Sequence, residues 1–186
     1  MANVLDFMRR QRAAAGQVRR SLGGIADARE RYTARVMSSV EAVRNASGGQ
    51  VGRAREAARR ARDPLAAFEK VLARETAGVM ESIAELSANW AEHEGLWDEL
   101  GPDDLETVVS AHESWTELRE AVREAREADR VFLQSLRDFA ALGHEVEEVS
   151  EGAIQRQQGI LAAAGELESL ANEYLVTIAA VEQRIR

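Results

Sequence analysis

Apolar and small residues recur in alternating steps of three and four along the last part of the chain, between residues 132 and 185. This spacing is that of a heptad repeat, in which one stripe of a helix faces a partner helix. The stripe consists of Phe132, Leu136, Phe139, Gly143, Val146, Ser150, Ala153, Gln157, Ile160, Ala164, Leu167, Ala171, Tyr174, Ile178, Val181 and Ile185. It keeps its phase through several glycines, and the chain contains no proline after Pro102. We therefore predict one continuous helix over about residues 102–186.

This helix is expected to bend within residues 143–152, where the stripe offers mostly small or polar side chains to bury. A true loop in the same stretch is the alternative, and it would give four helices instead of three. Proline and Asn-Gly, the usual signals of a loop, do not occur there. The sequence thus favours continuity.

Two earlier segments show the same three-and-four spacing. The first spans about residues 2–46 and ends in the polar, glycine-rich run 45–49, which is typical of a helix end followed by a turn. The second spans about residues 64–100 and starts at Asp63-Pro64, a pair typical of a helix start or a kink. The tight Gly101-Pro102 reversal makes the second and third helices antiparallel neighbours.

These patterns predict an all-α protein that forms a single elongated helical domain over residues 1–186. The favoured architecture is an elongated antiparallel three-helix coiled coil, and a four-helix up-and-down bundle is the alternative. The composition agrees, with 30% charged residues, only 5% aromatic residues and two prolines. Because the third helix is too long for the first two to cover, we expect it to pair with a second copy in a homodimer.

Positive charge is concentrated near the start of the chain. Residues 1–70 contain 15 Lys and Arg against 7 Asp and Glu, and the remaining residues contain 9 against 25. The arginines fall in the first helix and in a basic segment over residues 51–62, and together they predict an anion-binding or membrane-binding surface. They are Arg9, Arg10, Arg12, Arg19, Arg20, Arg53, Arg55, Arg59, Arg60 and Arg62.

Leu5 and Phe7 lie beside the first arginines and are the residues that we expect to insert into a bilayer. The alternative is that the apolar residues of this segment pack against a neighbouring helix, while the arginines pair with acidic side chains. Nucleic acid is not an expected partner, because the chain has a net charge of −8 and its basic segment lacks interleaved aromatic residues.

The sequence shows no catalytic motif. The chain has no cysteine, which excludes disulfides and thiolate ligands. Each of its three histidines precedes a glutamate, but none completes the His-Glu-x-x-His or Glu-x-x-His spacing of metal sites. Phosphate-binding loops and nucleophile elbows do not occur either. We therefore predict a protein without enzymatic activity, metal or cofactor.

Aromatic and histidine residues gather on both sides of the reversal between the second and third helices. They are Trp90, His93, Trp97, His112 and Trp115. We predict that they form a cluster that locks the tip of this helical hairpin. The alternative is a ligand pocket at the same place, which would require the four-helix arrangement.

One acidic residue, Asp129, occupies a stripe position between Ala125 and Phe132. A buried carboxylate is costly unless it is paired, so we expect an arginine from its own helix or from the first helix beside it. The predicted role of Asp129 is to fix the register or the oligomeric state of the helices.

Residues 105–158 resemble the central helix of BAR domains of the sorting-nexin type. The resemblance depends on Trp115, on Ala128-Asp129 followed by Phe132-Leu133 and Leu136, on Asp138-Phe139, and then on Val146 and Arg156. It implies a dimer of antiparallel three-helix coiled coils, a curved rod whose basic face binds anionic membranes.

Our leading functional hypothesis is therefore a non-enzymatic scaffold that dimerises and binds an anionic membrane surface, sensing or shaping its curvature. A soluble helical-bundle adaptor for a protein partner is the main alternative, and a ligand-sensing four-helix bundle is the third. Asp6, Arg9 and Arg10 interrupt the apolar start, unlike a signal peptide, and the longest stretch without a charged residue or histidine is nine residues. We expect a cytoplasmic protein that is soluble or peripheral to a membrane.

Overall fold

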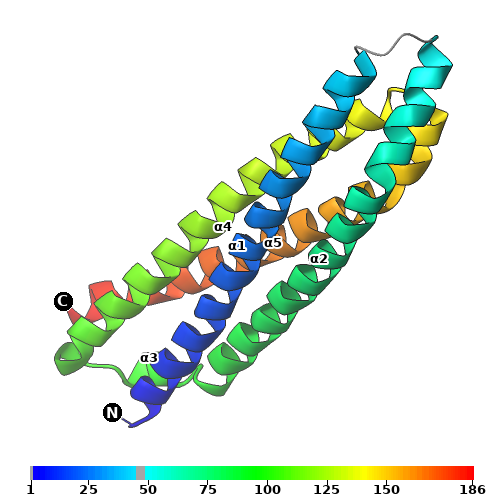
Figure 1. Ribbon diagram of the computed structural model, residues 1–186. Helices are drawn as coiled ribbons and strands as arrows, with labels where there is room; N and C mark the ends of the chain where they lie inside the picture. The colour runs from blue at the N-terminus through cyan, green and yellow to red at the C-terminus, as the bar shows by residue number, and fades with distance from the viewer. Residues whose placement is uncertain (1, 45–48) are drawn as a thin grey trace. The chain divides into compact units, whose positions relative to one another are not determined.

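A computed structural model describes residues 2–44 and 49–186, and the side chains of residues 4–36 and 49–186 (Figure 1). Within these ranges the chain is helical and contains no β-strand, so the all-α prediction is confirmed. The elements are α1 (Ala2–Arg44), α2 (Gln50–Glu92), α3 (Leu96–Glu99), the 3₁₀ turn η1 (Pro102–Asp104), α4 (Leu105–Ala140) and α5 (His144–Ile185). The predicted break at residues 45–49 lies outside the described residues, apart from Gly49.

The prediction of one continuous helix over residues 102–186 is wrong. Helix α4 ends at Ala140, and α5 begins at His144 after a short turn. Backbone N–H groups of residues 141 to 143 still donate to carbonyl oxygens of the last turn of α4, and Val146 N–H then donates to Gly143 O at 3.0 Å. At Gly143 a Cβ atom would lie 2.9 Å from the Cβ of Ala54, so this turn approaches α2 too closely for any side chain.

The second helix also differs from its predicted bounds. Helix α2 begins at Gln50, so the basic segment 51–62 is part of it, and Pro64 lies inside the helix instead of at its start. It ends at Glu92, and the stretch up to Leu100 forms a turn and the four-residue helix α3. The reversal itself agrees with the sequence analysis: Gly101 N–H donates to the carboxylate of Asp104 at 3.1 Å, ahead of α4.

The chain divides into two compact units. Unit 1 comprises Met1–Leu22, Ala77–Ala125 and Ala163–Arg186, and unit 2 comprises Gly23–Thr76 and Arg126–Ala162. Each unit therefore contains segments of α1, α2, α4 and α5. Fully or almost fully buried aliphatic side chains form both cores. In unit 1 they include Val18, Val79, Leu86, Val108, Leu118, Leu167 and Ile178, and in unit 2 Ile25, Leu65, Leu72, Leu136, Val146 and Ile160.

The apolar stripe of α5 is buried along its whole length. Its twelve positions from Val146 to Ile185 are each at most 6% exposed. In unit 2 the side-chain nitrogen of Gln157 lies 3.4 Å from the backbone oxygen of Asp129, and in unit 1 His112 contacts Glu182. Within both units α5 therefore packs against α4 of its own chain, and the stripe does not require a second copy to cover it.

Candidate functional site

The predicted hairpin-tip residues lie in unit 1, where Phe7 from α1 is central to them. The Phe7 ring centroid is 5.2 Å from that of Trp97, 5.6 Å from that of His93 and 6.0 Å from that of Trp90. Trp90 stacks on Tyr174 of α5 at 3.9 Å, and Trp115 meets the same tyrosine edge-on at 5.0 Å. Phe7 and Tyr174 were not part of the predicted cluster. Aromatic packing of this kind gives the cluster a structural role.

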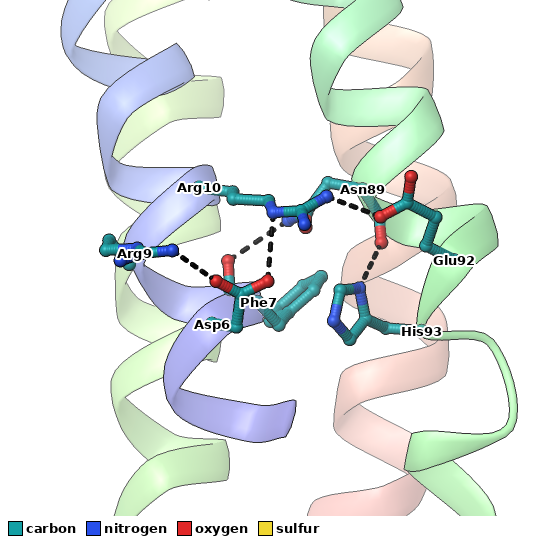
Figure 2. Close-up of polar contacts among 7 residues, drawn as sticks. All are labelled: Asp6, Phe7, Arg9, Arg10, Asn89, Glu92 and His93. Carbon is teal, nitrogen blue, oxygen red and sulfur yellow. Dashed lines mark hydrogen bonds and ion pairs between the residues drawn. The ribbon is translucent and has the colours of Figure 1, made fainter. Parts of the chain in front are cut away.

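Polar contacts clamp the start of α1 to the end of α2 beside this cluster, as Figure 2 shows. The side-chain amide N–H of Asn89 donates a hydrogen bond to the backbone oxygen of Phe7, with a nitrogen–oxygen distance of 3.0 Å. Asp6 accepts from Arg9 at 2.5 Å and from Arg10 at 2.9 Å, and Arg10 also pairs with Glu92.

The two histidines of the predicted cluster have different surroundings. His93 Nδ1 lies 2.8 Å from the backbone oxygen of Asn89, so this nitrogen carries the hydrogen and donates it. His112 instead contacts the carboxylate of Glu182 through Nδ1 at 2.9 Å. The pKa of Glu182 is below its usual value, mainly because of a hydrogen bond from Arg186 and secondly because of this one from His112. The histidines therefore serve two separate contacts in unit 1.

The two residues that were predicted to insert into a bilayer, Leu5 and Phe7, differ in exposure. Leu5 is 69% exposed, but Phe7 is only 1% exposed. Phe7 is therefore unavailable for insertion into a bilayer, and that part of the prediction is wrong. The physical reason is that Phe7 lies on the same helical face as Val4 and Met8, which are also buried in unit 1.

Most of the predicted basic residues contact neighbouring side chains. In α1 these contacts join Arg9 and Arg10 to Asp6, Arg12 to Ser110, Arg19 to Glu117 and Arg20 to Gln17. In α2, Arg55 pairs with Glu145 of α5 at 3.0 Å. Hydrogen bonds from Arg59 and then Arg60 lower the pKa of Glu56 to about 2. The arginines of residues 53–62 therefore share their surface of unit 2 with acidic side chains.

Asp129 is buried in unit 2 and pairs with an arginine of α1. It is 1% exposed, and one carboxylate oxygen lies 2.5 Å from Nη1 of Arg29. Burial raises the pKa of Asp129, and hydrogen bonding by Gln157 and the charge of Arg29 oppose that rise. The expectation of an arginine from the first helix agrees with this contact.

A groove of about 450 Å³ lies between α1 and α2 in unit 2, and the sequence analysis did not predict it. Its lining residues are Gly24, Asp27, Ala28, Arg31, Tyr32 and Arg35 of α1 and Pro64, Ala67, Phe68, Val71 and Arg74 of α2. Ala28 and Ala67 are small lining residues, as is Gly24, against which the Glu75 side chain packs. We call this site the α1–α2 groove.

Two aromatic rings form the base of the α1–α2 groove. Tyr32 and Phe68 stack with centroids 5.2 Å apart, and Phe132 of α4 packs edge-on against both. Tyr32 and Phe68 are 5% and 3% exposed, so only a small part of each ring faces the groove. The Tyr32 hydroxyl is neutral at physiological pH, and burial raises its pKa further. The base of the groove is therefore uncharged.

Three exposed arginines and one acid line the α1–α2 groove. The Nε–H of Arg31 donates to the backbone oxygen of Asp27, with a nitrogen–oxygen distance of 3.2 Å. The Nε–H of Arg74 donates to the carboxylate of Glu75, with a distance of 2.8 Å. Guanidinium groups form paired hydrogen bonds with carboxylates or phosphates, and they are more easily desolvated than ammonium groups. Apolar surface bordered by arginines suits an occupant with an apolar body and negative charge.

Among the described residues, no group of three or more acidic or histidine side chains is placed to hold a metal ion. In that part of the chain, the helices are also too short or too polar to cross a bilayer. Comparison with models of known protein families, with curated proteins and with solved structures found no match.

Proposed function

We propose that the chain is a helical binding module without enzymatic activity, and that the α1–α2 groove binds an anionic partner. The observation that carries this proposal is the combination of Arg31, Arg35 and Arg74 with an aromatic base in one groove. Isolated surface arginines are common, but arginines around an apolar hollow provide charge recognition and a place for a buried anchor. This function is closest to the soluble adaptor considered from the sequence.

Within each unit, we infer an up-and-down arrangement of four helical segments. Support comes from the presence of α1, α2, α4 and α5 in both units, and from the short turn at residues 141–143. Such a unit buries its own apolar stripes, and its exposed surface is left for partners.

Because the α5 stripe is buried within the chain, we expect the protein to be monomeric in dilute solution. Light scattering coupled to size exclusion should give the mass of one chain over the micromolar range. A stable dimer would contradict this expectation and would restore the homodimer predicted from the helical stripe.

The membrane scaffold has less support than the binding module. Phe7 is buried, and Arg55 pairs with Glu145 at the start of α5, where Glu147, Glu148 and Glu151 follow. These acids would oppose the approach of anionic lipid headgroups to this part of unit 2.

The proposed site is tested with 8-anilinonaphthalene-1-sulfonate, a fluorescent aromatic anion, as the probe. We expect Arg31→Glu/Arg35→Glu to weaken probe binding at least about tenfold, because two cations facing the groove become anions. Ala67→Trp should also weaken binding, since the indole would occupy the hollow. Both measurements are fluorescence titrations on variants whose helical circular dichroism matches that of the unmodified chain.

The matched control is Arg53→Glu/Arg62→Glu, which changes the net charge equally at two exposed positions of α2 outside the groove. Probe binding should change less than about threefold in this control, because neither arginine lines the groove and screening weakens charges that do not contact the probe. Equal losses in both charge-reversal variants, or no effect of Ala67→Trp, would refute the α1–α2 groove as the binding site.

A further inference from the structure

We infer that the natural occupant of the α1–α2 groove is an α-helix of a protein partner that presents two carboxylates, one helical turn apart, beside one large apolar side chain. This inference rests on the proposed binding role of the groove and adds the chemistry of the partner. It follows from the length of the groove, the order of its charges and the position of its apolar base.

The groove follows two antiparallel helices. A Cβ atom at Gly24 would lie 3.0 Å from Cδ of Glu75, and Tyr32 stacks on Phe68, so residue numbers rise along α1 as they fall along α2. The lining residues cover positions 24–35 and 64–74 in helical steps of three and four. Twelve helical residues extend about 18 Å, which matches roughly three turns of a helix laid along the groove. Helix-in-groove recognition has this geometry.

An apolar anchor is expected where the small residues open the groove. Ala28 and Ala67 line the groove together with the Tyr32–Phe68 stack, and Pro64 and Val71 border it on the α2 side. One leucine, methionine or phenylalanine from the partner would cover this base. A single anchor in a well-packed pocket commonly supplies much of the affinity of such an interface.

The charges along α1 specify where the partner must be acidic. Arg31 and Arg35 are one turn apart on the same face of α1, so their guanidinium groups suit carboxylates at positions i and i+4 of a parallel or antiparallel helix. Asp27 lies one turn before Arg31 and would repel a third carboxylate there. Arg74, on the opposite wall, already pairs with Glu75, so the partner need not present an acid at that end.

This pattern fits a helix better than a lipid surface. A bilayer would contact the exposed arginines of the rim but would not fill the hollow above Tyr32 and Phe68. A helix reaches both, because the side chains at i and i+1 point about 100° apart. With glutamates at i and i+4, an apolar residue at i+1 or i+3 therefore faces the base while the glutamates face Arg31 and Arg35.

The test uses the full chain and a displayed library of alanine-based helical 18-residue peptides with randomised positions along one face. We expect the selected peptides to be enriched in acidic pairs at i and i+4 with a large apolar residue at i+1 or i+3. They should displace 8-anilinonaphthalene-1-sulfonate. Their affinity should fall at least about tenfold for Arg31→Glu/Arg35→Glu and for Ala67→Trp, and less than about threefold for Arg53→Glu/Arg62→Glu.

The outcomes separate this inference from the proposed function on which it rests. If the fluorescent probe binds the groove but no selected peptide displaces it, the helix partner is refuted and the anion-binding groove remains. Enrichment of peptides without acidic pairs would also refute it, as would displacement of the probe by phosphatidylserine vesicles with the same variant dependence. Displacement by free benzoate at the concentrations at which peptides act would assign the groove to small organic anions. Failure of the probe itself to depend on Arg31 and Arg35 would remove both proposals.

Discussion

Replacing Arg29 with methionine is expected to lower the free energy of unfolding by about 3 kcal/mol at neutral pH. Arg29 is the charged partner of Asp129, which is 1% exposed in the core of unit 2. Methionine retains much of the length and apolar stem of arginine but leaves the carboxylate without its cation. Removing one member of a buried ion pair costs more than the pair contributes, because the remaining charge stays desolvated.

The loss should depend on pH in a defined direction. Burial raises the pKa of Asp129, and Arg29 is among the groups that oppose the rise, so the substitution raises this pKa further. The folded variant then keeps the carboxyl protonated at pH values where the unfolded chain has released that proton. Stability relative to the unmodified chain is therefore retained at about pH 4, near the unfolded pKa, and falls as pH rises toward about pH 7.

Urea unfolding followed by circular dichroism at both pH values measures this difference. The control is Asp129→Asn combined with Arg29→Met, which removes the buried charge and should recover most of the loss at neutral pH. An equal loss at both pH values, or no recovery in the double variant, would show that Arg29 acts through packing instead of charge.

The helices themselves follow from the sequence because their apolar positions repeat at the helical period. The turn at residues 141–143 does not, since the stripe stays in phase on both sides of it. Leu136 before the turn and Val146 after it are both buried in unit 2. A continuous helix and an antiparallel hairpin therefore give the same pattern of apolar and polar positions. The informative residue is Gly143, whose lack of a side chain is required by the approach of Ala54.

Contacts between distant segments explain what the sequence did not predict. Pairing of Asp129 with Arg29 joins residues 100 positions apart, so helical spacing alone offers several arginines and does not select among them. The α1–α2 groove is lined by Gly24 and Ala28 of α1 and by Ala67 of α2, which share one groove only because α1 and α2 pack together. Nothing in the sequence of either helix distinguishes these three residues from the other glycines and alanines of the chain.

Substitution of Phe7 tests whether the start of α1 packs in the core of unit 1 or inserts into a membrane. Replacing it with alanine is expected to lower the free energy of unfolding by about 3 to 4 kcal/mol. Its ring is 1% exposed and contacts Trp90, His93 and Trp97, so truncation removes buried apolar surface and leaves a cavity between α1 and α2 in unit 1. Thermal and urea unfolding of the full chain measure this change.

The matched control is Leu5→Ala, two residues away on the same helix but 69% exposed. It should change stability by less than about 0.5 kcal/mol, because its side chain is already in solvent. If both residues inserted into a bilayer, the two substitutions would instead weaken binding to phosphatidylserine vesicles alike and leave stability similar. A Phe7→Ala variant as stable as Leu5→Ala would therefore contradict the aromatic cluster, because the mutual contacts of Phe7, Trp90 and Trp97 require Phe7 to remain in the core.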